Sequence, residues 1–160
     1  MYVSGINDNC FALKNRVKTY ALAQGDVYFS QRSDLDHGHY WDRTQEVYHF
    51  MDKMLNGAQD SVTGFLDLTF RVNGTDAYVK VNNYATVKDK ISAINFLYTE
   101  STDADSHKWV YKTVDITLNA NGEEEINVKE RLPNARAFTY EFVMTEAQYR
   151  WTTEVVIWEV

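Results

Sequence analysis

The sequence predicts a mainly β protein: an antiparallel β-sandwich or jelly-roll-like double sheet of about eight strands, with two helices in the N-terminal third. Two observations lead to this prediction. From residue 61 onward, apolar and polar residues alternate over short segments that turn residues separate. Before that point, apolar residues recur at spacings of three and four, the period of a helix. We expect a single domain over 1–160, with a helix-containing part at 1–60 and antiparallel strands at 61–160.

The first helix is expected over residues 9–24, because Leu13, Val17 and Tyr20 recur on one face. Asp8 is the expected N-cap, and Gly25 is expected to stop the helix. Cys10 falls on the same apolar face, so we interpret it as a buried, unreactive thiol.

The second helix is expected to begin at residue 43. Asp42 stands at its N-cap and Gln45 follows three positions later, which is the spacing of a capping box. Asn56-Gly57 is expected to close it. One apolar stripe runs along this helix and consists of Val47, Phe50, Met51, Met54 and Leu55.

Three hairpins are expected among the strands. Asn73-Gly74 separates alternating runs at 64–72 and 77–81, and it is expected to form a type I′ turn, whose two central residues need positive φ. Asn121-Gly122 is expected to join strands within 108–118 and 123–130. The third hairpin joins strands at 137–144 and 149–158. Two further strands are expected at 91–99 and 26–32.

Charge and composition exclude several classes of partner. The chain carries 16 basic and 23 acidic residues, for a net charge of −7, and its basic residues stand singly. A duplex-binding protein clusters its Lys and Arg on one face, so we expect neither nucleic acid nor an anionic membrane as partner. A single cysteine allows no internal disulfide. The first nine residues lack the basic and apolar regions of a signal peptide, so we expect synthesis in the cytoplasm.

The stretch SDLDHGHYWD, residues 33–42, contains the best candidates for metal ligands. His37 and His39 are two residues apart, so both rings would point to one side of an extended segment, and Asp34 and Asp36 could add oxygen ligands. The spacing matches no specific motif: H-E-x-x-H is absent. We favour a structural interpretation, in which the stretch leads into the second helix, and we expect no metal or cofactor.

Two acidic segments are also candidates. Residues 99–107 contain Glu100, Asp103 and Asp105, which could hold calcium but lack the spacing of an EF-hand loop. Residues 123–125 are three consecutive glutamates beside an expected turn. We interpret them as solvated charges, because a carboxylate at an exposed tip is not desolvated as acid–base catalysis requires.

Aromatic side chains suggest a second kind of site. Trp109 and Tyr111 share one face of their expected strand, and Tyr149 and Trp151 share one face of theirs. A flat row of exposed rings on a sandwich can stack sugar rings, although core packing is the more common role of such rings.

The last strand is apolar on both faces, which bears on protein partners. Val155 and Ile157 lie on one side, and Val156 and Trp158 lie on the other. Such a strand is either central in its sheet or covered by another chain, so these four residues are candidate interaction residues.

No catalytic motif is present: the sequence contains no G-x-S-x-G, no P-loop and no G-x-G-x-x-G. We therefore hypothesise a non-catalytic structural or assembly protein that contacts other protein subunits, as a homo-oligomer or within a larger assembly. A small bacteriophage virion component, such as a head–tail connector, tail completion or decoration protein, fits this description. The alternatives are a carbohydrate-binding module and, after it, a metal-dependent enzyme that uses His37 and His39.

Overall fold

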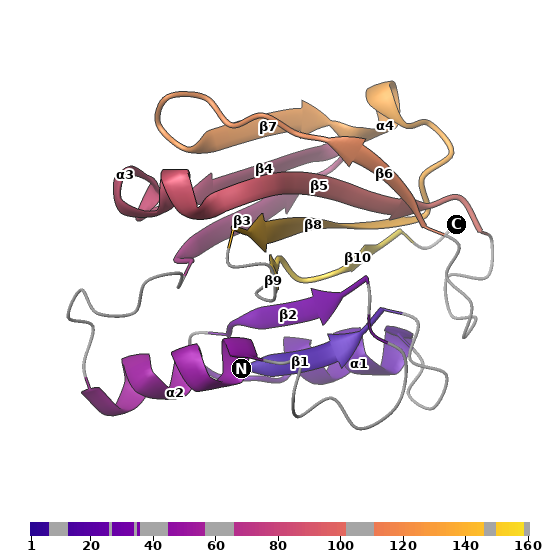
Figure 1. Ribbon diagram of the computed structural model, residues 1–160. Helices are drawn as coiled ribbons and strands as arrows, with labels where there is room; N and C mark the ends of the chain where they lie inside the picture. Colours follow the sequence, from indigo (N-terminus) through magenta and orange to yellow (C-terminus); the bar gives the residue numbers. More distant parts are fainter. Residues whose placement is uncertain are drawn as a thin grey trace.

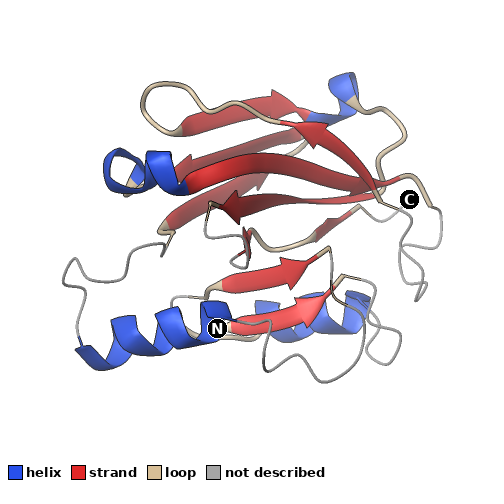
Figure 2. Cartoon of the chain, viewed as in Figure 1, coloured by secondary structure: helices blue, strands red, loops and turns tan. Residues whose placement is uncertain are grey.

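The computed structural model describes residues 1–6, 13–25, 27–33, 35, 45–56, 66–101, 111–145 and 150–158. Within these ranges the chain is mainly β and forms two sheets (Figures 1 and 2). The seven-stranded sheet contains β1 (Tyr2–Gly5), β2 (Phe29–Arg32), β5 (Ile91–Thr99), β6 (Lys112–Asp115), β8 (Ala137–Met144), β9 (Arg150–Thr152) and β10 (Val156–Ile157). The three-stranded sheet contains β3 (Leu68–Asn73), β4 (Asp76–Val81) and β7 (Glu123–Asn127).

Two helices belong to the N-terminal third, α1 (Leu13–Ala21) and α2 (Gln45–Asn56). Three single turns of helix accompany the later strands: α3 (Tyr84–Val87), η1 (Lys88–Lys90) and α4 (Val128–Arg131). Both long helices lie with β1 and β2 at one side of the molecule, while the other strands of the large sheet stack with the small sheet on the other side (Figure 1). The expected helix-containing N-terminal part and β-rich remainder are therefore both present.

The main core lies between the two sheets. Strand β8 supplies Phe138, Tyr140 and Phe142 from alternate positions, and β4 supplies Ala77 and Val79 from the opposite sheet. Alternation places every second side chain of each strand in this core, as the sequence predicts. A second cluster covers the other face of the large sheet and consists of Ile6, Leu13, Leu97, Ala137 and Val155.

The first expected hairpin is confirmed, with its turn shifted by one residue. Strands β3 and β4 pair antiparallel, and Asn73 stands opposite Asp76, so the two turn residues are Gly74 and Thr75 rather than Asn73 and Gly74. Gly74 has φ +61° at the first central position. A turn that begins with glycine supplies the positive φ without a side-chain clash, and the strands keep their register.

The second expected hairpin is wrong in its pairing. The chain does reverse at Asn121-Gly122, and Gly122 has φ +77°. The flanking strands nevertheless belong to different sheets, because β6 pairs with β5 whereas β7 pairs with β4. A turn signal reports a local change of direction, whereas the partner of each strand is set by its buried side chains.

The third expected hairpin is confirmed, but its second strand is interrupted. Glu141 pairs with Thr152 and Phe138 pairs with Val156, so two residues of β8 stand opposite three residues, 153–155. This one-residue excess is a β-bulge, which turns the chain over between β9 and β10. The bulge changes which side chains face the main core, because a one-residue shift reverses the faces of a strand.

The large sheet is mixed rather than purely antiparallel, which corrects the expected fold class. Strands β1 and β2 are parallel, with Tyr2 opposite Phe29 and Gly5 opposite Arg32, and α1 forms the crossover between them. Parallel neighbours need such a crossover connection. Residues 2–5 were not predicted as a strand, because four residues show too little alternation of apolar and polar side chains.

The two long helices lie where they are expected, but α1 ends at Ala21, before the expected stop at Gly25. Helix α1 buries Leu13 and Tyr20, as its apolar face predicts. The chain leaves the helix at Ala21, and Gly25 adopts φ +82°. Asp8, Cys10 and Asp42 lie outside the described residues, so the two expected N-caps and the expected burial of the thiol stay predictions.

A close backbone approach at Gly5 holds β1 beneath Leu35, which is 2% exposed. A Cβ atom at Gly5 would stand 2.0 Å from the carbonyl oxygen of Leu35 and 2.6 Å from its carbonyl carbon. We predict that Gly5→Ala lowers the free energy of unfolding by about 3 kcal/mol, because backbone atoms cannot yield as a side chain can. Urea unfolding followed by circular dichroism measures this loss.

Gly25→Ala is the matched control for this prediction. Gly25 has no heavy atom within 4 Å of its added Cβ, so only its positive φ is strained. That strain costs about 1 kcal/mol. Equal losses for the two substitutions would contradict the close approach at Gly5.

Candidate functional site

The candidate metal ligands of the sequence lie outside the residues that the structure describes. Asp34, Asp36, His37 and His39 are not among the described residues, and neither is His107. His49 lies half-buried on α2. Within the described ranges no three His, Cys, Asp or Glu side chains gather in a way that could hold a metal ion.

Of the four candidate sugar-stacking aromatics, the structure describes two. Trp151 is 1% exposed and packs in the main core, so its ring is not available to a sugar. Tyr111 is half-buried, and its hydroxyl donates a hydrogen bond to the carbonyl oxygen of Ser33 over 3.3 Å. Trp109 and Tyr149 lie outside the described residues.

The C-terminal strand packs on its own chain on both faces. Val155 and Ile157 join the second cluster, while Val156 and Trp158 pack against the main core. The ring of Trp158 lies 4.9 Å from that of Phe138, measured between centroids. Strand alternation produces this two-faced apolar pattern, both faces pack on the chain itself, and the bulge between β9 and β10 sets which pair of residues faces the main core.

The three consecutive glutamates do not behave alike, which corrects the expectation that all of them are solvated. Glu123 pairs with Lys80 over 2.7 Å, and Glu125 is exposed. Glu124 points inward from β7 toward Tyr140, and Arg131 lies 3.7 Å from its carboxylate. Burial raises the pKa of Glu124, although the Tyr140 hydroxyl and Arg131 act to lower it. Strand alternation gives the middle glutamate an inward direction.

Tyr140 and Glu124 form a buried polar pair inside the sandwich. Their contact falls short of well-aligned hydrogen-bond geometry, so the Tyr140 hydroxyl and one carboxylate oxygen of Glu124 stay buried without a full hydrogen bond. Burial and the adjacent carboxylate both raise the pKa of the Tyr140 hydroxyl. The pair therefore makes folding sensitive to pH rather than providing a solvent-accessible acid or base.

The most heavily buried ion pair of the described residues joins β2 to α2. Arg32 of β2 and Glu46 of α2 form an ion pair over 3.2 Å, with side chains 4% and 0% exposed. The backbone N–H of Arg150 donates to the same Glu46 carboxylate over 2.6 Å. Burial raises the pKa of Glu46, and Arg32 opposes this rise. These contacts fix the first turn of α2 against β2 and β9.

A second buried carboxylate extends this network along the sheet. Glu141 of β8 accepts from the guanidinium of Arg150 over 2.9 Å and from the hydroxyl of Ser33 over 2.8 Å. The amide of Asn95 on β5 also donates to Glu141, over 3.2 Å. Ser33 and Glu46 flank the segment that contains the two histidines. The network therefore anchors both ends of that segment to the sheet.

Helix α2 is thus held in a fixed orientation, yet its apolar stripe is only partly covered. Phe50 packs on Tyr28, with ring centroids 5.5 Å apart. Val47 is half-buried, whereas Met51, Met54 and Leu55 are open to solvent, and with their neighbour Tyr48 they form what we call the α2 apolar face. The exposed fractions are 57% for Tyr48, 49% for Met51, 51% for Met54 and 77% for Leu55.

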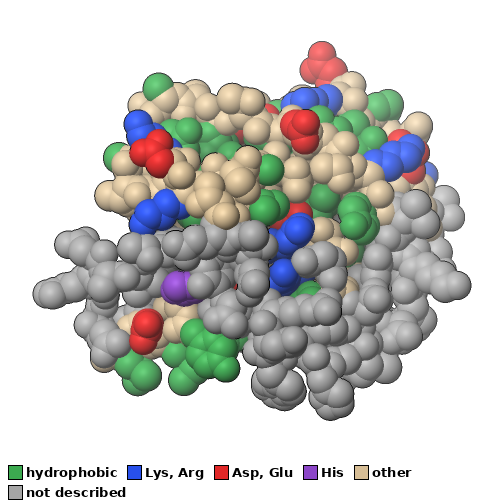
Figure 3. Space-filling view, in the orientation of Figure 1, with side chains coloured by type: hydrophobic (Ala, Val, Ile, Leu, Met, Phe, Trp, Pro, Cys, Tyr) green, Lys and Arg blue, Asp and Glu red, His purple; other side chains and the backbone are tan. Residues whose placement is uncertain are grey.

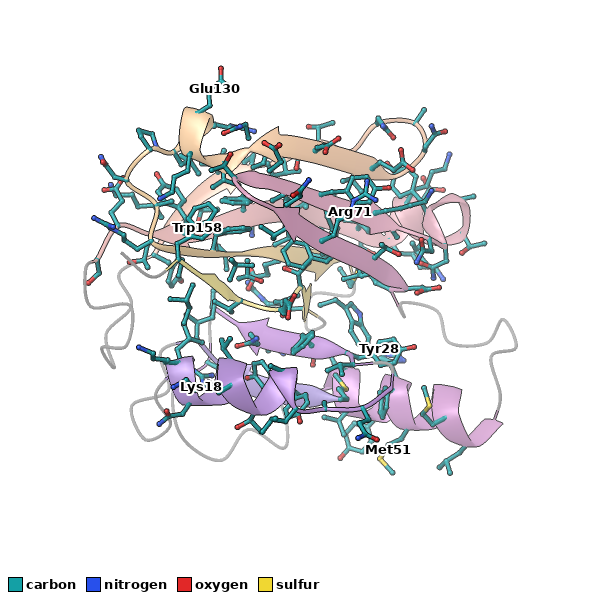
Figure 4. All side chains as sticks on the ribbon, turned by 180° about the vertical axis from the view of Figure 1, so that it is seen from behind. Lys18, Tyr28, Met51, Arg71, Glu130 and Trp158 are labelled. Carbon is teal, nitrogen blue, oxygen red and sulfur yellow. The ribbon has the colours of Figure 1, made fainter. Side chains whose placement is uncertain are left out.

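The α2 apolar face forms a hydrophobic patch on the surface. Figure 3 shows hydrophobic side chains gathered over α2 at the lower left of the molecule. In the view from behind, Met51 points away from the rest of the protein (Figure 4). A clustered apolar patch on a surface commonly marks an interaction site, whereas single exposed apolar residues are normal.

Sequence reasoning missed the charged network and had little means of finding it. Arg32 and Glu46 lie on different elements, and Glu141 falls at a polar position of an alternating strand, where it is expected to face water. The α2 apolar face was visible as a helical stripe, but period alone does not tell which part of a stripe is covered.

Comparisons with protein families, with curated proteins and with solved structures find no match to this chain. Among the helices of the described ranges, none is long and apolar enough to cross a bilayer. Function is therefore inferred from the geometry of the molecule itself.

We predict that Glu46→Gln lowers the free energy of unfolding by roughly 3–5 kcal/mol, since it removes the charge that faces buried Arg32. Replacing Arg32 and Glu46 together with methionine recovers most of this loss, because burying the pair costs about as much as its attraction returns. Urea titration measures both variants. Glu100→Gln breaks the exposed pair with Lys112 and is expected to leave stability unchanged. A Glu46→Gln variant as stable as Glu100→Gln would refute the role of the buried pair.

We predict that Glu124 makes the folded state less stable as the pH rises. A carboxyl whose pKa is raised by folding contributes stability below its unfolded pKa and loses it as the pH rises through the folded pKa. Glu124→Gln removes this component, so the variant should exceed the parent in stability at neutral pH but not in acid. Thermal unfolding across pH 4 to pH 8 measures the difference. Glu125→Gln, on the outer face, is expected to retain the parent profile.

Proposed function

We propose that this chain is a non-catalytic assembly protein that acts through protein–protein contacts, and that the α2 apolar face is its contact surface. One observation carries the proposal: four apolar side chains of a single helix, Tyr48, Met51, Met54 and Leu55, are half or more exposed. Leaving such a patch in water forgoes about 25 cal/mol for every Å² of apolar surface, which association would recover.

The buried ion pair supports an interaction role for this helix. Glu46 and its contacts with Arg32 and Arg150 hold the first turn of α2 on the sheet. A helix that is fixed before binding loses less conformational freedom on association than a mobile one. The α2 apolar face is thus prepared for a partner without further ordering.

A second copy of the chain is the partner we propose. A two-fold contact needs only one self-complementary patch, and two-fold homodimers are the commonest soluble assemblies. The four side chains of the α2 apolar face are uncharged, and the exposed Asp52 stands beside them on the same helix.

Two finer statements belong to the same proposal. Jelly-roll double sheets recur in viral capsid and lectin domains, and we propose a jelly-roll-like arrangement for the two sheets here. We also propose that the assembly is a bacteriophage virion, in which the chain is a connector, tail completion or decoration protein. The link from fold to virion is an analogy between architectures.

We predict a concentration-dependent dimer or larger oligomer in light scattering coupled to size exclusion. Met51→Asp with Leu55→Asp should produce a monomer, because charges would be buried unpaired in the contact. Leu22→Asp is the control: Leu22 is 82% exposed and lies just after α1, outside the α2 apolar face. A parent chain that stays monomeric at every concentration, or a Leu22→Asp variant that dissociates equally, would overturn the proposal. Circular dichroism checks that all variants fold.

A further inference from the structure

A groove separate from the α2 apolar face opens beside the bulge between β9 and β10. It has a volume of about 240 Å³ and lies where β2 begins, between β9 and the edge strand β3. Tyr28 lies in this space between β2 and β3 in the view from behind (Figure 4). Five aromatic residues are among its described lining: Tyr20, Tyr28, Phe29, Phe70 and Trp151. Tyr20 and Trp151 are buried, so the rings available to a ligand are those of Tyr28, Phe29 and Phe70.

One carboxylate joins these rings. Glu154 lies within the bulge and is the single charged residue of the groove's described lining. A bulge redirects a side chain that a regular strand would place elsewhere, and bulges are frequent next to functional sites. The side chain of Glu154 remains exposed to solvent, and its partial burial raises the pKa of the carboxyl.

This combination of groups favours a cation with an apolar body. Aromatic rings attract cations through their electron-rich faces, and Trp, Tyr and Phe together form the cages that bind substituted ammonium groups. A carboxylate at the same place adds direct charge attraction. The net charge of −7 also raises the local concentration of cations around the protein.

The size of the groove limits the ligand. Pockets for drug-sized molecules measure roughly 300–1,000 Å³, so a groove of about 240 Å³ suits a smaller molecule. Within it, Phe29 and Phe70 remain half-buried, so part of each ring is available for contact.

We propose that this groove binds a small organic cation with a substituted ammonium head, held by the aromatic rings of β2 and β3 and by the carboxylate of Glu154. This site is independent of the α2 apolar face, so either proposal can fail without the other.

The test uses choline and its neutral isostere 3,3-dimethylbutanol as probes of the full chain. We expect choline to produce saturable changes in the amide NMR signals of residues 152–154 and 27–29, and the isostere to bind about tenfold more weakly because it lacks the charge. Glu154→Gln should weaken choline binding by about tenfold without affecting the isostere. Tyr28→Leu should weaken choline as well, because it removes one ring.

Two controls match these variants. Glu125→Gln and Tyr78→Leu make the same changes on the outer face of the three-stranded sheet, and both should bind choline as the parent chain does. Equal binding of choline and its isostere, no saturable binding of choline, or unchanged affinity in Glu154→Gln would overturn the proposal. Binding of Nα-acetyl-lysine amide, whose side-chain ammonium stays charged, without binding of choline would also overturn the proposal, in favour of a basic side chain from a protein partner.

Discussion

The carboxylate of Glu46 is the point on which the N-terminal part of the molecule depends. It faces Arg32 from the neighbouring strand and accepts from the backbone of Arg150 in the strand beyond. Burial of a carboxylate costs several kcal/mol, and one ion pair recovers this only in part. The pair is therefore better understood as a device that fixes the position of α2 than as a source of net stability. The packing of Phe50 on Tyr28 adds an apolar contact that supports the same orientation.

The same network explains why a polar strand can lie inside the sheet. Strand β2 buries Ser30, Gln31 and Arg32, which is unusual for an interior strand. Ser30 donates to the carbonyl oxygen of Arg150, and the backbone N–H of Gln31 donates to the hydroxyl of Thr152. Hydrogen bonding of this kind removes much of the cost of burying Ser30 and the backbone of Gln31, whereas the side-chain amide of Gln31 has no hydrogen-bond partner among the described residues. Polar contacts of Glu46 and Arg150 thus join α2 to the large sheet, whereas apolar packing joins both α1 and the small sheet to it.

The β-bulge between β9 and β10 is the second feature that shapes the structure. Alternation alone puts Val155 and Val156 on opposite faces, and the bulge decides that Val156 faces the main core while Val155 joins the second cluster. It also places Glu154 beside aromatic side chains of β2 and β3. One extra residue thus sets which cluster each face of β10 joins and lies beside a groove that sequence patterns do not predict.

Local order was predictable from the sequence, whereas partners in space were not. Alternation predicted β3, β4, β5 and β8, and helical spacing predicted α1 and α2, because period depends on neighbouring residues alone. The separation of β6 from β7, the parallel pairing of β1 with β2 and the burial of Glu141 depend on what covers each face. Glu124 illustrates the limit: its inward direction follows from alternation, but the presence of Tyr140 opposite it comes from another strand far along the chain.

The central claim is that α2 is fixed on the sheet and presents its apolar face to a second copy. Amide hydrogen exchange of the unmodified chain at low and high protein concentration tests it most directly. We expect amide exchange to slow with rising protein concentration in residues 45–56 and to stay constant in residues 155–158. Unchanged exchange in α2, or slowing confined to the C-terminal strand, would contradict it.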